Sequence, residues 1–99
     1  MTASASVQSE EITRLVTIVN VKGLHARASA KFVSVAELWA ADISVTYEQE
    51  TVPACSIMGL MMLGAGVGAT ITLRATGPQA EEALSALAEL VEAGFDEGE

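Results

Sequence analysis

The stretch over residues 51–73 contains no charged side chain and is the longest of its kind in the chain. Its length alone would suit a transmembrane helix, which needs about 20 apolar residues. Four glycines and Pro53 interrupt it, however, and its period changes midway. Residues 57–63 suit a short helix, whereas residues 69–75 alternate apolar and polar side chains as a half-buried strand does. Two elements joined by a glycine-rich turn are not one spanning helix, so we predict no membrane insertion.

The rest of the chain shows the periods of strands and amphipathic helices in a clear order. The predicted strands are residues 13–20, 42–48, 51–54 and 69–75, and the predicted helices are residues 26–41, 57–63 and 78–93. The order βαββαβα predicts an α+β open-faced β-sandwich, in which helices cover one face of a four-stranded antiparallel sheet.

Residues at the helix ends fit these assignments. Ser56 can cap the N-terminus of the short helix, and Gly64 would end it. The last helix would start with a proline at its first position and a capping box formed by Thr76 and Gln79. Gly94 would end that helix.

A chain of 99 residues is too short for two domains. We expect a flexible N-terminal tail over residues 1–11, one domain over residues 12–94 and an acidic C-terminal tail over residues 95–99. Residues 1–11 lack the basic and apolar regions of a secretory signal. Cys55 is the only cysteine and allows no intrachain disulfide, which fits a reducing cytoplasm. With one cysteine and one histidine, we predict no metal site and no cofactor.

Charge is unevenly distributed along the chain. The formal net charge of -8 argues against nucleic-acid binding, which needs clustered Lys and Arg. No acidic residue lies between Glu11 and Glu37, yet this segment holds four of the five basic residues and the only histidine. These residues are Arg14, Lys22, His25, Arg27 and Lys31. The segment is a candidate anion site in an otherwise acidic protein.

His25 would lie in the loop that leads into the N-terminus of the first long helix. Unpaired backbone N–H groups and the helix dipole favour an anion there, and Arg27 adds a guanidinium that grips phosphate oxygens. A neutral imidazole has one ring nitrogen free for nucleophilic attack. A lone histidine in a loop is ordinarily only a surface residue, so the residues alone leave both interpretations open. A hydrolytic triad lacks partners, and the glycines at 64–68 lack the lysine of a P-loop.

Two segments, GLHAR at residues 23–27 and SIMGLMMLG at residues 56–64, together resemble the HPr family of histidine-containing phosphocarriers of the bacterial phosphotransferase system. The resemblance extends over residues 13–93 and implies the strand order 1-4-2-3. It implies that the Nδ1 atom of His25 accepts a phosphoryl group from Enzyme I, itself charged by phosphoenolpyruvate, and passes it to IIA-type proteins. Arg27 would steady the phosphohistidine. The protein would be a phosphocarrier rather than a stand-alone enzyme.

The resemblance also implies a regulatory site and a docking surface. Ser56 would be phosphorylated by HPr kinase/phosphorylase, although an N-cap role alone explains its position. Ile57, Met58 and Met61 would contact partners, although Met58, Met61 and Met62 could instead all lie in the core. Seven apolar residues on two helical turns cannot all face inward, so at least one should be exposed.

The family commonly has proline where this chain has Ala28, a good helix former, so we expect the helix start to survive. Cys55 stands before Ser56, where the family often has lysine nearby. We expect a cytoplasmic monomer. The alternatives are a regulatory phosphoprotein or binding module of a phosphotransferase branch without permeases, and an anion-binding protein that transfers no phosphoryl group.

Overall fold

The structure is a computed structural model that describes residues 11–97. Its elements are β1 (Ile12–Thr17), α2 (Ala26–Ala36), β2 (Asp42–Tyr47), β3 (Glu50–Pro53), α3 (Ile57–Met62), β4 (Thr70–Thr76), α4 (Ala80–Glu92) and the short 3-10 helix η1 (Gly94–Asp96). The predicted order βαββαβα is confirmed, with η1 as an addition. The predicted tail over residues 1–11 lies outside the described residues except for Glu11.

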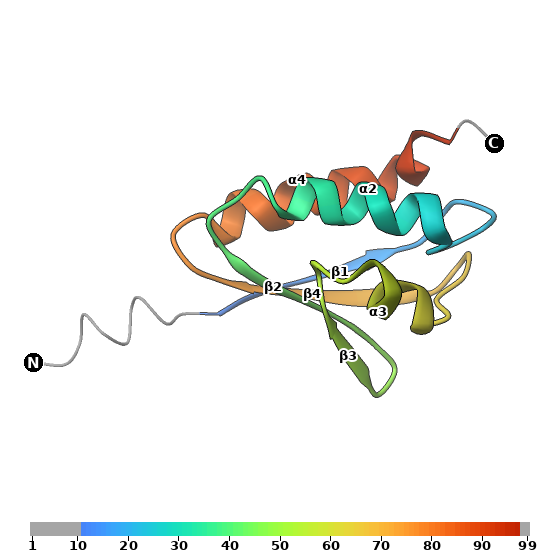
Figure 1. The fold of residues 1–99 in the computed structure, drawn as a ribbon, viewed down its shortest axis with the longest axis horizontal. Coiled ribbons are helices and arrows are strands. Elements are labelled where there is room, and N and C mark those ends of the chain that lie inside the picture. The colour runs from blue at the N-terminus through green and yellow to red at the C-terminus, as the bar shows by residue number, and fades with distance from the viewer. Residues whose placement is uncertain (1–10, 98–99) are drawn as a thin grey trace, which may run out of the picture.

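The four strands form one antiparallel sheet in the order β1-β4-β2-β3. This is the order that the resemblance implies. Val16 lies opposite Ile71, and Val45 lies opposite Leu73, so apolar side chains of neighbouring strands meet on one face. Figure 1 shows α2 and α4 side by side above this face, with α3 below the start of α2. The architecture is the predicted α+β open-faced sandwich.

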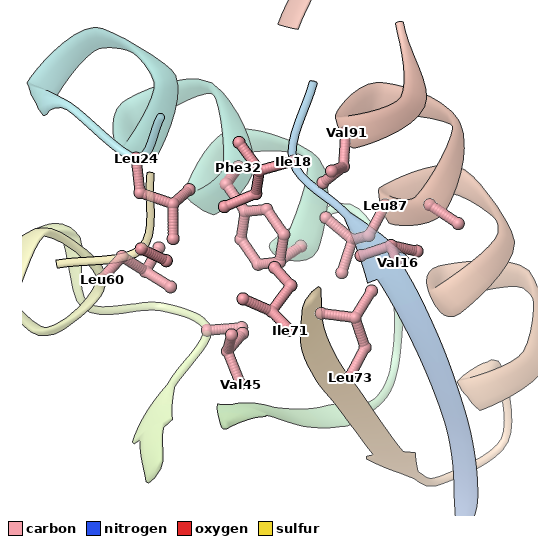
Figure 2. Close-up of a cluster of buried hydrophobic side chains, with 14 of the residues drawn as sticks. Val16, Ile18, Leu24, Phe32, Val45, Leu60, Ile71, Leu73, Leu87 and Val91 are labelled. Atoms are coloured by element: carbon pink, nitrogen blue, oxygen red, sulfur yellow. The ribbon is translucent and has the colours of Figure 1, made fainter. Parts of the chain in front are cut away.

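The core lies between the sheet and the two long helices (Figure 2). Phe32 of α2 occupies its centre, where it meets side chains from the strands and from α4. The most completely buried large side chains are Phe32, Phe95, Ile18, Leu60, Ile71, Leu73, Leu84 and Leu87. Burial of this apolar surface supplies the main stabilising free energy of a domain of this size.

The first long helix is shorter than predicted, because contacts from a distant segment end it. It stops at Ala36 instead of residue 41, and Leu38 beyond it is 71% exposed. The Ala40 N–H donates to the Gln79 Oε1 atom at 2.8 Å, and the Gln79 N–H donates to the Ala40 oxygen at 3.0 Å. These two bonds hold residue 40 in a turn against the start of α4.

The same pair of bonds changes the start of the last helix. It begins at Ala80 rather than Pro78, and Gln79 is its N-cap without a side-chain capping bond. The predicted capping box with Thr76 is therefore wrong, because the Gln79 side chain accepts a hydrogen bond from the Ala40 N–H instead.

The strand β1 is also shorter than predicted and ends at Thr17 instead of residue 20.

The C-terminal end differs most from expectation. Gly94, with a φ of 64°, follows the last residues of α4 as predicted. The next residue, Phe95, is fully buried in the core, so the predicted acidic tail does not begin at residue 95. The packed domain extends beyond the predicted boundary at residue 94. Within residues 11–97, no helix is long and apolar enough to cross a membrane.

Candidate functional site

The loop between β1 and α2 is fixed against the segment that follows α3. The Leu24 N–H donates to the Ala65 oxygen at 3.1 Å, and the Leu24 side chain is 5% exposed. Gly23 has a φ of 63°, and a Cβ atom on it would lie 2.5 Å from the Ala65 oxygen. Only glycine fits both this conformation and this close approach. The loop therefore delivers the next residue, His25, to a fixed place.

His25 is the N-cap of α2. Its backbone is extended, and its carbonyl oxygen accepts the first helical bond from the Ser29 N–H at 2.8 Å. Its Nδ1 atom accepts a hydrogen bond from the Arg27 N–H at 3.3 Å. The buried Ser29 hydroxyl donates to the Leu24 oxygen at 3.1 Å and ties this turn to the loop. The imidazole thus lies at the positive end of the helix dipole, with Nδ1 facing the backbone donors.

The other ring nitrogen of His25 faces a carboxylate. The Nε2 atom is hydrogen-bonded to the Oε2 atom of Glu97, and the two side chains are 27% and 10% exposed. A backbone N–H only donates and a carboxylate only accepts, so the partners of the neutral ring assign its tautomer. Nε2 carries the proton, and Nδ1 carries the lone pair.

Charged side chains surround the imidazole. A surface depression beside His25 is lined by Lys22, Ala26, Arg27, Lys31, Asp96 and Glu97. Three of the four basic residues of the predicted segment therefore lie around His25. Arg14 is the exception, because its guanidinium lies 3.4 Å from the Ser85 hydroxyl of α4. The site combines a nucleophilic nitrogen, a helix N-terminus and a guanidinium, the groups that an anionic phosphoryl group requires.

Ser56 is the N-cap of α3, as predicted. Its hydroxyl oxygen accepts a hydrogen bond from the Gly59 N–H at 2.9 Å. Gly59 packs closely beneath it, since an added Cβ atom would lie 2.9 Å from the Ser56 hydroxyl oxygen. Ser56 is half-buried, and the free thiol of its neighbour Cys55 is exposed.

The short helix α3 exposes most of its apolar side chains. Leu60 is fully buried, but Ile57, Met58 and Met61 are 40%, 66% and 40% exposed. Met62, which was not among the predicted partner contacts, is exposed further still, at 76%. The prediction that part of this helix lies exposed is therefore confirmed. We call Ile57, Met58, Met61 and Met62 the α3 patch.

The α3 patch and His25 lie at the same end of the molecule. In Figure 1 the start of α2, the helix α3 and the end of the described chain lie together on the right. The bond between Leu24 and Ala65 links the histidine loop to the segment that leaves α3. Exposed Val21 and Val67 add apolar surface from those two loops. A partner that reached His25 would meet apolar surface beside it.

Two residues of the site escaped the sequence analysis. Glu97 is 72 positions from His25, and no local pattern relates them. Asn20 is buried, and its Nδ2 atom donates to the Gly23 oxygen at 2.9 Å and to the Glu97 Oε1 atom at 3.2 Å. A polar residue just before a glycine turn was the one available signal for Asn20. Among residues 11–97, no group of three or more His, Cys, Asp or Glu side chains could hold a metal ion.

Ala28, where proline is common in the family, leaves the helix start intact. It is fully buried on the first turn of α2, and His25 still caps the helix. The expectation that the cap survives this departure is confirmed.

Together these features define a small α+β domain that presents one histidine at a helix N-terminus beside basic side chains. Residues 12–93 match the family model described as PTS HPr component phosphorylation site. The chain belongs to the HPr family of phosphocarriers of the phosphotransferase system.

Relatives and solved structures agree over nearly the whole chain. The phosphocarrier protein HPr of Cupriavidus necator is 46% identical over 88 residues, which cover 89% of this chain and 99% of that protein. The HPr of Pseudomonas aeruginosa is 49% identical over 85 residues, 85% of this chain and 94% of that protein. A crystal structure of HPr from Thermoanaerobacter tengcongensis superposes with a TM-score of 0.81 at 41% identity, and covers 91% of this chain and 99% of that one.

Proposed function

We propose that the Nδ1 atom of His25 accepts a phosphoryl group from phosphorylated Enzyme I and donates it to IIA-type proteins. The observation that carries this proposal is the contact of Nδ1 with the Arg27 N–H at the N-terminus of α2. This contact leaves the proton on Nε2 and a lone pair on Nδ1, where the helix dipole favours negative charge. The protein is then a relay component rather than a stand-alone enzyme.

The transfer is a displacement at phosphorus. The lone pair of Nδ1 forms an N–P bond while the bond from phosphorus to the donor's nitrogen breaks. The phosphoryl oxygens come to lie beside the first backbone N–H groups of α2, and the exposed Arg27 side chain is long enough to add a bidentate guanidinium. In the second transfer, a nucleophile of the IIA-type protein forms a bond to phosphorus while the N–P bond to Nδ1 of His25 breaks.

Ile57, Met58 and Met61 of the α3 patch are the proposed docking contacts. Their exposure beside the histidine loop supports this role, because apolar side chains exposed together stabilise a protein complex. Methionine side chains adapt to differently shaped surfaces. Such adaptability suits a carrier that binds Enzyme I first and a IIA-type protein afterwards.

A second proposed role is regulation through Ser56, phosphorylated by HPr kinase/phosphorylase. The Ser56 hydroxyl lies next to Ile57 and Met58 of the docking surface, so a phosphate there would place about two negative charges against any partner. In a phosphotransferase branch without permeases, this role would be the main one. The two roles are compatible because they use different atoms.

Two labelling reactions separate the roles. With radioactive phosphoenolpyruvate, magnesium and Enzyme I, the wild type should take an acid-labile label that His25→Ala abolishes and Ser56→Ala retains. With radioactive ATP and HPr kinase/phosphorylase, Ser56→Ala should abolish the label and His25→Ala should retain it. Arg27→Ala should slow the first reaction by at least about tenfold. A label that persists in His25→Ala would refute transfer through His25.

A matched pair of substitutions tests the docking surface. Met58 and Leu38 are 66% and 71% exposed, but Leu38 lies just past the far end of α2. Met58→Ser should raise the KM of Enzyme I for this protein severalfold, whereas Leu38→Ser should leave it unchanged. Equal effects would contradict docking at α3.

We also propose that the protein is a cytoplasmic monomer. Light scattering on the purified protein would measure its mass in solution.

A further inference from the structure

The segment over residues 94–97, which we call the C-terminal strap, is held in an unfavourable backbone conformation beside the site. Phe95 and Asp96 have φ angles of 57° and 58°, in the left-handed region that favours glycine. The buried Phe95 side chain anchors the strap, and the Lys31 ammonium donates to the Phe95 oxygen at 2.6 Å. Strained backbone persists where the surrounding contacts determine it, and it is concentrated at functional sites.

The strap places the carboxylate of Glu97 between two donors. The Oε2 atom contacts His25 Nε2, and the Oε1 atom accepts from Asn20 Nδ2 at 3.2 Å. Asn20 is itself fixed, because it is 3% exposed and also donates to the Gly23 oxygen of the histidine loop. The Glu97 side chain is 10% exposed, so little water competes for its oxygens. One rigid amide therefore orients the carboxylate, and the carboxylate orients the ring.

We propose that Glu97 is a positioning residue that holds the Nε2 proton of His25 through both steps of phosphoryl transfer. This inference rests on the proposed function. A carboxylate that accepts from one ring nitrogen fixes the tautomer and the ring plane, as in hydrolytic triads. It thus complements the backbone contact at Nδ1.

The charge balance of the transfer gives Glu97 a role in each direction. When Nδ1 forms its bond to phosphorus, the ring keeps the Nε2 proton and becomes a cation. The carboxylate stabilises this cation more than the neutral ring, which favours acceptance. When the N–P bond breaks, the bonding electrons return to Nδ1 of a still protonated ring, which is a good leaving group. No proton needs to leave or enter the site.

The test compares Glu97→Gln with Glu92→Gln. Both variants remove one negative charge near the C-terminal end of the described chain, but only Glu97 contacts the histidine. The amide side chain in Glu97→Gln would have only one oxygen for the two donors, whereas Glu92 is the exposed last residue of α4 and does not line the depression beside His25. Circular dichroism would establish that both variants are folded.

Two measurements are made on each protein. In NMR spectra of the imidazole nitrogens, the Nε2–H of the wild type and of Glu92→Gln should be protected from solvent exchange, and that protection should be lost in Glu97→Gln. With Enzyme I and phosphoenolpyruvate, Glu97→Gln should take up label about tenfold more slowly, and Glu92→Gln should stay within about twofold of the wild type. A merely structural role would leave the ring proton unchanged.

The outcomes separate the two proposals. If the wild type takes no label on His25, the proposed function fails. If the wild type is labelled and Glu97→Gln matches it in rate and in Nε2–H protection, only the role of Glu97 fails. An equal loss of rate in Glu97→Gln and Glu92→Gln would also overturn it, because the effect would then follow from charge and not from the contact.

Discussion

Replacing Gly23 by alanine tests how closely the histidine loop packs against the segment after α3. Two costs add at this position. Its φ of 63° is unfavourable for alanine by about 1–2 kcal/mol. The new Cβ atom would also lie 2.5 Å from the Ala65 oxygen and 2.7 Å from the Gly66 Cα atom. Both neighbours are backbone, so no side-chain rotation relieves the contact.

The cost of the contact follows from the bond it breaks. A Cβ atom approaches other atoms no closer than 3.0 Å, so the two segments must separate by about 3.0 - 2.5 = 0.5 Å. This separation lengthens the bond from the Leu24 N–H to the Ala65 oxygen, now 3.1 Å, and its loss costs about 1 kcal/mol. Gly23→Ala should therefore lower the free energy of unfolding by about 2–4 kcal/mol, including strain in the surrounding packing.

Gly64→Ala is the matched control. Gly64 has nearly the same φ, 68°, but nothing lies within 4 Å of a Cβ atom built on it. It should lose only the conformational part, about 1–2 kcal/mol. Urea denaturation followed by circular dichroism measures both variants. Equal losses of stability would refute the close approach, and so would an unchanged amide resonance of Leu24 in Gly23→Ala.

Three further substitutions test the core and the caps in the same assay. Phe95→Ala should lose about 3–5 kcal/mol and Phe95→Leu less than about 1.5 kcal/mol, because the side chain is fully buried, and losses below about 1 kcal/mol for both would mean that the strap is not packed. Ser56→Ala should lose about 1 kcal/mol while Ser56→Asp stays near the wild type, since aspartate also caps, and equal stability of all three would exclude the capping bond. Leu60→Ala should lose about 2–5 kcal/mol, whereas Met62→Ala, at a site 76% exposed, should lose less than about 0.5 kcal/mol, and the opposite order would invert the assigned faces of α3.

The sequence predicted the elements well wherever a local period decides them. The alternation predicted for residues 69–75 and the amphipathic period predicted for residues 26–41 appear in the structure as the buried faces of β4 and α2. Errors arose where distant residues end an element. Ala40 and Gln79 are 39 positions apart, and their paired bonds shorten one helix and delay the start of another. No sequence pattern near Ala40 or near Gln79 predicts that pairing.

The C-terminal strap was missed for a related reason. Residues 95–99 contain three acidic side chains, and Gly94 is a good helix terminator, so the segment resembles a solvated tail. A single aromatic residue after the glycine is enough to fold it back, because burying one phenylalanine contributes about 1.5–3 kcal/mol. Periodicity over a window cannot detect one such anchor.

The candidate site divides in the same way between local and distant residues. Histidine, arginine and the helix start are adjacent in sequence, and their geometry follows from one cap. The net charge of the site, in contrast, depends on residues that are distant in sequence. Lys22, Arg27 and Lys31 contribute three positive charges, but the strap adds Asp96 and Glu97, so the groups lining the depression sum to 3 - 2 = +1. An anion bound there would depend on directed donors, the N–H groups of α2 and the Arg27 guanidinium, more than on a strongly positive field. The acidic strap is compatible with an anion site because the carboxylate of Glu97, on a side chain that is 10% exposed, is hydrogen-bonded to the ring it orients.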